Sequence, residues 1–315
     1  MMILMLILLA EPIERPVHTY SIVAYDAETG EIGAAVQSHW FSVGSLVIWA
    51  EPGIGAVATQ SFVRIDYGPL GLKAMADGED PAAIMKKLTQ NDQGQAVRQV
   101  AMVDAKGRVA GHTGANCIDF ACDKQGKGYS VQANMMLKNT VCEAMSKAFE
   151  ATKGSLARRL MAAMEAAQNE GGDIRGKQSA AIKVVKAAKQ NNPWEGVVME
   201  LRVEDHPHPI KELNRLVGIH EAYEFMNKGD IALENKEVTK AMEYYSQAVN
   251  RLPDRVEPIF WQAVNLVNIG RTDAALPLFR RVFEKDKNWR LLIPRIAKVG
   301  LIPNKEPILR AIAEQ

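Results

Sequence analysis

The chain has 315 residues, too many for one typical domain and about right for two, and 47% of them are hydrophobic, which is ample material for buried cores. Its 38 Lys and Arg residues nearly balance its 37 Asp and Glu residues, and the formal net charge is +1. This balance excludes the basic surplus of a nucleic-acid-binding protein and any long acidic tail. We therefore expect two domains and no nucleic-acid partner.

Residues 1–18 form a leader before the first convincing strand. Residues 1–10 are an almost uninterrupted apolar run, too short to span a bilayer as a helix but long enough for the core of a signal peptide. A cleaved signal would place the protein in the periplasm or outside the cell. Because no Lys or Arg precedes the run, an uncleaved anchor and a start codon assigned too far upstream are alternatives. Without a cleaved signal we expect a cytoplasmic protein.

From residue 19 to about residue 205 the pattern predicts a mixed α and β domain. Two hairpins come first, because paired β-prone runs flank turns that contain Gly with Asp or Pro. Two pairs of helices and further strands follow. In chain order, we expect strands at 19–25, 31–38, 45–50 and 55–60, helices at 67–77 and 81–89, strands at 99–105, 109–113 and around 128–132, helices at 137–151 and 155–169, and strands at 179–185 and 196–203.

The order of these elements favours an α+β fold over a doubly wound parallel sheet. Hairpin strands imply antiparallel sheets, and helices that follow one another in pairs can cover the outer faces. We therefore predict a four-layer αββα sandwich over residues 19–210. No GxGxxG loop, P-loop or GxSxG elbow occurs in this stretch, and we expect no cofactor.

Five stretches of this domain carry a resemblance to a known family: TYSIVA (19–24), GIGAVATQ (53–60), YGPLG (67–71), GYSVQAN (128–134) and GGDIRGKQSAA (171–181). Together they resemble domain of unknown function 1028, an uncharacterised family that is similar in fold to N-terminal-nucleophile hydrolases. The resemblance covers roughly residues 19–210 and implies the αββα sandwich. It also implies a special role for Thr19, because many relatives start at Met-Thr or place this threonine next to a signal cleavage site.

Thr19 becomes a candidate nucleophile if cleavage makes it the first residue. A terminal threonine carries its own base, since a free α-amine with a pKa of about 7.7–8.0 lies within reach of its Oγ. Without cleavage, Thr19 is only a β-branched residue that begins a strand. His18 is unsuited to signal peptidase, which needs a small residue, so we expect autocatalytic cleavage of the 18–19 bond or none. No lysine lies between Thr29 and Arg64 to act as in proteasome-like enzymes.

Asp173, Arg175 and Ser179 are further catalytic candidates, between a helix end and a strand start. A carboxylate held by a guanidinium could orient the terminal amine. The alternative for the Asp173–Arg175 pair is a surface ion pair in a glycine-rich turn.

Ser38, Gln60 and Asn134 are candidates for binding substrate. Gln60 and Asn134 follow strand ends, where their amides could donate to an oxyanion or a substrate amide. The alternative is that they cap loop backbone. Ser38 lies where we expect a polar neighbour of Thr19.

The cysteines and histidines do not suggest a metal site. Cys117, Cys122 and Cys142 are odd in number and lack a CxxC spacing, which favours buried thiols over a disulfide framework or a zinc site. In residues 205–209, prolines beside two histidines are typical of an extended linker edge, and we expect no metal there.

Residues 211–315 are predicted to be wholly helical and to contain a repeat of 34 positions. Small and aromatic residues recur at this period, as Gly229 and Ala263, Ala241 and Ala275, Tyr245 and Phe279, and Ala248 and Val282. The pattern resembles two tetratricopeptide repeats, with residues 213–225 and 289–313 as caps. Such a module usually binds a protein or peptide. The alternative is a packing or self-association appendage.

Two functions therefore compete. The first is an amidohydrolase that uses Thr19 on a small amide or peptide-like substrate and carries a repeat module. The second is a non-catalytic binding or scaffold protein whose repeats recruit a partner.

Overall fold

The computed structural model describes residues 15–17 and 19–315, and the chain divides into two compact units after Asn214. The apolar run at residues 1–10 and the residue before Thr19 lie outside the described residues. In the part that is described, no helix combines the length and the apolar character needed to cross a membrane.

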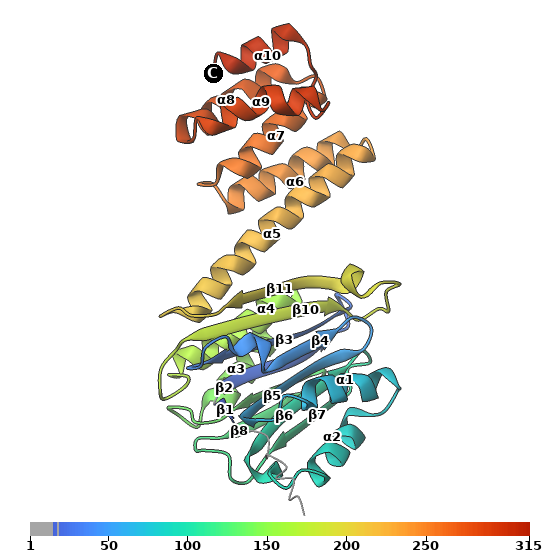
Figure 1. The fold of residues 1–315 in the computed structure, drawn as a ribbon, viewed down its shortest axis with the longest axis vertical. Coiled ribbons are helices and arrows are strands. Elements are labelled where there is room, and N and C mark those ends of the chain that lie inside the picture. Colours follow the sequence, from blue (N-terminus) through green and yellow to red (C-terminus); the bar gives the residue numbers. More distant parts are fainter. Residues whose placement is uncertain (1–14, 18) are drawn as a thin grey trace, which may run out of the picture. The chain divides into compact units, whose positions relative to one another are not determined.

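The first unit contains two antiparallel sheets (Figure 1). In the first sheet the strands lie in the order β1-β5-β6-β7, and β4 also pairs with β5. These strands are β1 (Arg15–Val17), β4 (Ile48–Glu51), β5 (Gly55–Val63), β6 (Arg98–Asp104) and β7 (Val109–Thr113).

The second sheet has the order β11-β10-β3-β2-β9-β8, so β2 and β3 lie at its centre. Its strands are β2 (Thr19–Asp26), β3 (Glu31–Ser38), β8 (Cys122–Gly126), β9 (Tyr129–Ala133), β10 (Ser179–Lys186) and β11 (Val197–Val203). The central hairpin β2–β3 turns at Gly30, whose φ of 67° is the left-handed conformation that glycine tolerates best.

Two helices pack on each sheet. The first sheet carries α1 (Tyr67–Ala76) and α2 (Pro81–Gln90), and the second carries α3 (Val141–Ala151) and α4 (Leu156–Asn169). The starts of α2 and α4 follow from sequence, because the Asp80 and Ser155 side chains accept hydrogen bonds from the first-turn N–H groups of Ala82 and Arg158. Pro81 occupies the first turn, where its missing N–H costs nothing.

The two sheets face each other across a core of small and β-branched residues. Alternate residues of β5 divide between two cores: Ala56 and Ala58 point toward the second sheet, whereas Val57 packs under the helices with Leu72 and Ile84. The small side chains allow close approach of the sheets.

The prediction of a mixed α+β domain with antiparallel sheets, followed by a helical region, is confirmed. Two strands were missed. β1 has only three residues and contains Pro16, and β8 reads CDKQG, which lacks an apolar alternation. The helix predicted from residue 137 begins instead at Val141.

The second unit is helical, and α5 runs into it from the first. The helices are α5 (Pro209–Glu234), α6 (Val238–Arg251), α7 (Val256–Asn268), α8 (Thr272–Lys285), α9 (Asn288–Lys298) and α10 (Glu306–Ala313). Gly229 lies against the Tyr245 ring so closely that a Cβ on it would be 2.5 Å from Cε1. In the next pair of helices, Ala263 and Phe279 are both fully buried in one core.

Candidate functional site around Thr19

Thr19, Ser38 and Ser179 form a row across three neighbouring strands. Ser38 of β3 lies opposite Thr19 of β2 on one side and opposite Ser179 of β10 on the other. Residues directly opposite each other in antiparallel strands share a face of the sheet. All three are buried. Val36 of β3 and Ala181 of β10 lie two residues away from Ser38 and Ser179 on the same face of the sheet, and both belong to the core between the sheets. The fold thus brings together three predicted site residues that are far apart in sequence.

The main-chain carbonyl of Thr19 is the point on which Gln60 and Asn134 converge. It accepts hydrogen bonds from the main-chain N–H of Asn134 at 3.1 Å, from Gln60 Nε2 at 3.1 Å and from Asn134 Nδ2 at 3.5 Å. Sequence reasoning expected these amides to face substrate. In the structure they hold the main chain of the candidate nucleophile itself, which is a positioning role.

Behind these contacts lies a buried network of neutral side chains. Gln60 Oε1 accepts from Ser21 Oγ at 2.7 Å, and Gln60 Nε2 donates to Gln99 Oε1 at 2.7 Å. Asn134 Nδ2 also donates to Gln99 Oε1, at 2.9 Å. Gln132 Nε2 completes the set by donating to Ser21 Oγ at 3.2 Å. Amides and hydroxyls do not titrate near neutral pH, so this network offers hydrogen bonds without a second base.

Gln99 is the hub of the network, and sequence reasoning missed it. Its Nε2 lies within hydrogen-bond distance of Thr113 Oγ1, the Cys122 carbonyl and the Ala133 carbonyl, at 3.0, 3.1 and 3.0 Å. A signal for the network does exist in the sequence. Polar residues alternate with buried apolar ones in strands β2 and β9, and polar residues at buried strand positions need partners.

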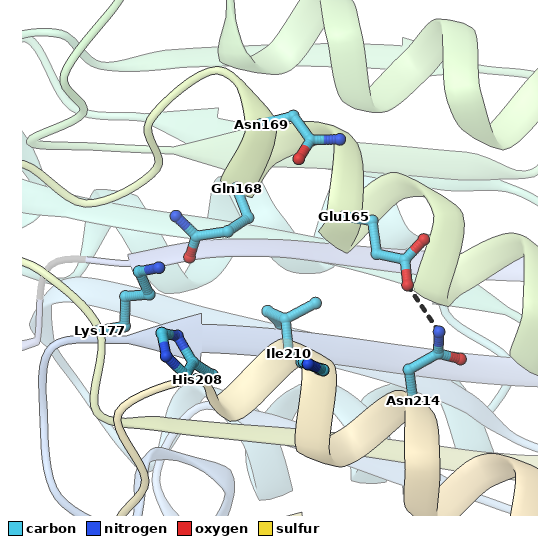
Figure 2. Close-up of a pocket in the computed structure, with 8 residues that line it drawn as sticks. Glu165, Gln168, Asn169, Lys177, His208, Ile210 and Asn214 are labelled. Carbon is cyan, nitrogen blue, oxygen red and sulfur yellow. Dashed lines mark hydrogen bonds between the residues drawn. The ribbon is translucent and has the colours of Figure 1, made fainter.

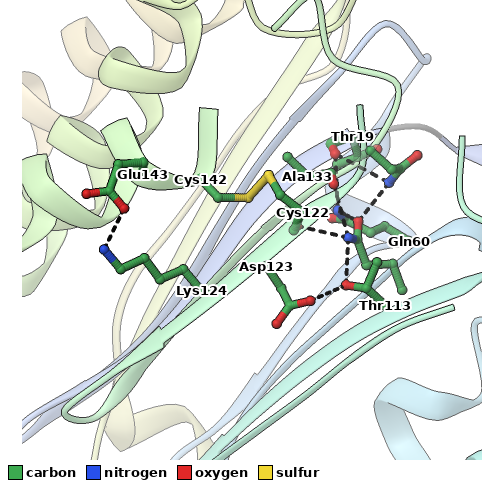
Figure 3. The surroundings of a disulfide bond; sticks show 11 residues. Thr19, Gln60, Thr113, Cys122, Asp123, Lys124, Ala133, Cys142 and Glu143 are labelled. Atoms are coloured by element: carbon green, nitrogen blue, oxygen red, sulfur yellow. Dashed lines mark hydrogen bonds and ion pairs between the residues drawn. A yellow bond between two sulfur atoms is a disulfide. The ribbon is translucent and has the colours of Figure 1, made fainter. Parts of the chain in front are cut away.

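Cys122 and Cys142 form a disulfide that joins β8 to α3, so the prediction that all three cysteines are buried thiols is wrong for these two (Figure 3). The disulfide depends on the position of β8, a strand that the sequence pattern did not reveal. Cys142 lies 20 residues after Cys122 in the chain. Cys117 remains a free, buried thiol that donates to the Arg98 carbonyl at 3.3 Å. Burial raises the pKa of the Cys117 thiol, which keeps it protonated and unreactive.

Asp173 and Arg175 form the predicted ion pair, with 2.7 Å between Oδ2 and Nη2 and 3.0 Å between Oδ1 and Nε. The carboxylate also accepts from the main-chain N–H groups of Arg175 and His39, at 2.9 and 3.1 Å. His39 directly follows Ser38, so these bonds fasten the loop after α4 to the end of β3. Burial, assisted by the nearby Asp173 carboxylate, raises the pKa of Tyr20 well above its usual range. The Asp173 carboxylate of the pair is buried, whereas the Arg175 side chain remains 26% exposed, so the pair lies at the edge of the core.

The Ser179 hydroxyl forms hydrogen bonds with the main chain of the loop that follows β3. Its Oγ donates to the Trp40 carbonyl at 2.5 Å and accepts from the Val43 N–H at 3.0 Å. Both contacts fix residues 40–43 beside the row, which is a structural task. Ser38, whose carbonyl accepts from the Gln178 N–H at 3.1 Å, lies between Ser179 and Thr19.

Residues 19–213 match the sequence model of a family described as a family of unknown function, DUF1028. The chain belongs to this family. A solved structure of a DUF1028 protein from Silicibacter pomeroyi is 32% identical with a TM-score of 0.57, and the similarity covers 64% of this chain and 88% of that chain. No curated protein matches the chain. The family match begins at Thr19, and the DUF1028 domain ends close to the division between the two units.

An apolar rim, defined here as Ile118, Phe120, Leu137 and Ile174, lies on loops that are hydrogen-bonded to one another directly after Asn134, which contacts Thr19. These side chains are 37%, 46%, 50% and 59% exposed. Their loops are joined through Met135, which follows Asn134: Met135 N–H donates to the Ile118 carbonyl at 2.9 Å, and Ile174 N–H donates to the Met135 carbonyl at 3.1 Å. Exposed apolar groups gathered beside a candidate site are typical of a binding surface.

A pocket of about 320 Å³ is lined by residues of α4 and of the start of α5, and none of the predicted site residues lines it. Glu165, Gln168, Lys177 and His208 are among its lining residues, and Asn214 Nδ2 donates to Glu165 Oε1 at 2.7 Å (Figure 2). Among residues 15–17 and 19–315, no three His, Cys, Asp or Glu side chains gather as metal ligands would.

Proposed function

We propose that this protein is an amidohydrolase of the N-terminal-nucleophile type, in which Thr19 acts once the preceding residues are removed. The observation that carries the proposal is the position of Thr19 at the head of β2, buried between two facing antiparallel sheets with a helix pair on each outer side. We assign this arrangement to the αββα sandwich of N-terminal-nucleophile hydrolases. The start of the family match at Thr19 also supports the proposal.

The chemistry follows from the terminal threonine. Thr19 Oγ attacks the carbonyl carbon of a substrate amide while its proton passes to the Thr19 α-amine. The C–N bond then breaks, the leaving amine takes the proton, and the acyl group remains on Oγ as an ester. Water, activated by the same α-amine, attacks the ester and releases a carboxylic acid and the free hydroxyl. In the intact chain Thr19 has no free amine. There its Oγ would attack the carbonyl carbon of residue 18, the C–N bond would break with the proton passing to the departing Thr19 nitrogen, and water would hydrolyse the resulting ester to a carboxylic acid and the free Thr19 hydroxyl.

In this mechanism the neighbouring side chains hold the nucleophile. Gln60 and Asn134 bind the Thr19 carbonyl, which fixes the orientation of its Oγ and amine. The Asp173–Arg175 pair keeps the adjacent loops in place, and we assign substrate binding to Ser38, which lies opposite Thr19. The α-amine is the base because the buried network is neutral.

The Cys122–Cys142 disulfide bears on the compartment. Disulfides persist in oxidising compartments and are rare in the cytosol. We therefore propose that the protein is exported, as the apolar leader predicts, and that it acts in the periplasm or outside the cell.

We propose that residues 211–315 form a tetratricopeptide-like module that binds a protein or peptide or associates with a second copy. The close fit of Gly229 against Tyr245 supports this assignment, because such repeats pack a small residue against an aromatic one.

A second candidate function is a non-catalytic binding protein in which the leader stays attached. The pairing of β1 with β5 favours it, since β1 precedes Thr19 and occupies an ordered place in the sheet. The repeats would then recruit a partner to an inert sandwich.

Intact-mass spectrometry of the purified full chain tests the proposal. We expect a mature chain that begins at Thr19, retention of residues 15–18 in Thr19→Ala, and cleavage in Thr19→Ser, whose hydroxyl can perform the same attack. A wild-type chain that keeps residues 15–18 would contradict the mechanism and favour the binding protein.

A further inference from the structure

The edge of β5 beside Thr19 is occupied by a short piece of the chain itself. β1 pairs antiparallel with β5, with Arg15 opposite Val63, Pro16 opposite Phe62 and Val17 opposite Ser61. Val17 is separated from Thr19 by a single residue. The three residues of β1 therefore lie on the carbonyl side of the 18–19 amide, as the acyl part of a peptide substrate would.

This edge becomes available when β1 leaves. β6 pairs with β5 from Gly55 to Ser61 along one edge, and β4 pairs with Gly55 to Ala58 along the other. β1 takes the continuation of the β4 edge, from Ser61 to Val63. Removal of residues 1–18 would leave β5 with an unpaired stretch next to the new terminus, and such an edge is a template for another strand.

The direction of the main-chain groups shows which residues of β1 are held. The N–H of Thr59 donates to the Val47 carbonyl on the β4 side at 3.0 Å, and groups two residues apart in a strand point the same way. Because Pro16 has no N–H, the Pro16–Phe62 pair is a non-hydrogen-bonded pair of the antiparallel ladder, and the flanking pairs with Ser61 and Val63 are the hydrogen-bonded ones. The Phe62 carbonyl instead accepts from Arg98 Nη1 at 2.7 Å, away from this edge. Pro16, which has no N–H to donate, lies opposite Phe62.

Two features keep this edge in shape. Arg98 is buried and forms an ion pair with Asp92 at 2.8 Å, so the guanidinium that holds the Phe62 carbonyl is itself fixed. Ser61 has a φ of 71°, an uncommon conformation for a residue other than glycine, and one that is often found at functional sites.

We propose that the substrate is an extended peptide that binds along Ser61–Val63 in the place of β1, with its scissile carbonyl delivered to Thr19. This inference rests on the proposed function. Counting back from that carbonyl, the second and fourth residues of the peptide form main-chain hydrogen bonds with Ser61 and Val63. The third residue needs no N–H, so proline is accepted there. The peptide binds by strand addition, so main-chain hydrogen bonds contribute more to binding than side-chain contacts do.

The test uses the chain that begins at Thr19 and three peptides with an aminocoumarin amide at the C-terminus. The parent has the sequence of residues 14–18, Glu-Arg-Pro-Val-His. The second peptide carries an N-methyl group on its valine, and the third has alanine in place of proline. We expect turnover of the parent, about a tenfold or greater loss of kcat/KM on N-methylation, and a change of less than about twofold for alanine. Binding of the same peptides to a Thr19→Ala chain that is produced without residues 1–18, so that β1 does not occupy the edge, is expected to show the same order.

The outcomes separate the two proposals. If Thr19→Ala abolishes turnover but N-methylation of the valine has no effect, the strand-addition inference is wrong and the nucleophile stands. If the parent is neither bound nor cleaved while another amide is turned over through Thr19, the peptide substrate class is again wrong. Turnover that survives in Thr19→Ala would refute the proposed function itself.

Discussion

Gln60 Nε2 donates a 3.1 Å hydrogen bond to the main-chain carbonyl of Thr19, although the two residues belong to different sheets. The same amide nitrogen reaches Gln99 Oε1, and its oxygen accepts from Ser21. One side chain thus ties the start of β2 to β5 and β6. The position of the candidate nucleophile depends on contacts between the sheets as well as on the strand to which it belongs.

Replacement of Gln60 by leucine is expected to lower the free energy of unfolding by about 2–3 kcal/mol, because the buried Ser21 hydroxyl would lose its acceptor and Gln99 Oε1 would lose one of its two donors. Denaturant unfolding measures this. Gln37→Leu is the matched control. Gln37 is equally buried, and neither atom of its amide has a hydrogen-bond partner among the described residues. That variant should be neutral or more stable, and equal losses in both would contradict the role given to the network.

The disulfide should make a large contribution to stability. The two cysteines are 20 residues apart in the sequence. The loss of chain entropy in the unfolded state for a loop of this length predicts a stabilisation of about 3 kcal/mol. The double variant Cys122→Ser with Cys142→Ser is expected to lose this amount in denaturant unfolding. Alkylation of the unfolded, unreduced wild type should label Cys117 alone. Labelling of all three cysteines would show that the bond is absent.

Acid should weaken the first unit through Asp92. Burial alone would raise the pKa of this carboxyl, but hydrogen bonds from Arg98, Tyr67 and the Gly94 N–H outweigh it and lower the pKa to about 2. A lowered folded pKa gives stability that is present above the unfolded pKa of 3.8 and is lost as pH falls toward 2. The loss is on the order of 2 kcal/mol.

Urea unfolding between pH 5 and pH 2 checks this expectation. Asp92→Asn should be less stable than wild type at pH 5, because Arg98 loses its buried partner, and should depend less on pH below 4. An unchanged slope in the variant would assign the acid sensitivity to other carboxyls.

In the helical unit, Gly229→Ala is expected to destabilise by about 1–3 kcal/mol through overpacking against Tyr245, despite the better helix propensity of alanine. Asn227→Ala, at an exposed position of the same helix, is the control and should change little. Thermal unfolding of the full chain measures both. A stabilised Gly229→Ala would show that the two helices lie further apart than the structure has them.

Local patterns were enough to predict much of the fold. Turn residues marked the β2–β3 hairpin, and Asp80 with Pro81 marked the start of α2. These signals act within a few residues, and the structure has the hairpin and the helix where they were expected.

What could not be predicted depends on contacts between distant residues. In the sequence, Gln99 does not differ from other polar residues at the start of a strand, and its role follows only from the contact of β6 with β9. The disulfide partner of Cys122 likewise follows only from the packing of β8 against α3. Thr19, Ser38 and Ser179 were each singled out, but their alignment follows only from the strand register. For Gln60 and Asn134, sequence selected the residues but not the carbonyl they bind.

The short strand β1 has a consequence for timing. While the chain is intact, β1 is tethered one residue from Thr19, so its effective concentration at the β5 edge is on the order of millimolar. A free peptide at lower concentration cannot compete with a tethered one of similar sequence. Cutting the 18–19 bond turns this permanent occupant into a dilute, diffusible product. Under our proposals the protein would therefore be made as a self-inhibited precursor, and one irreversible cut would both create the catalyst and vacate its binding site.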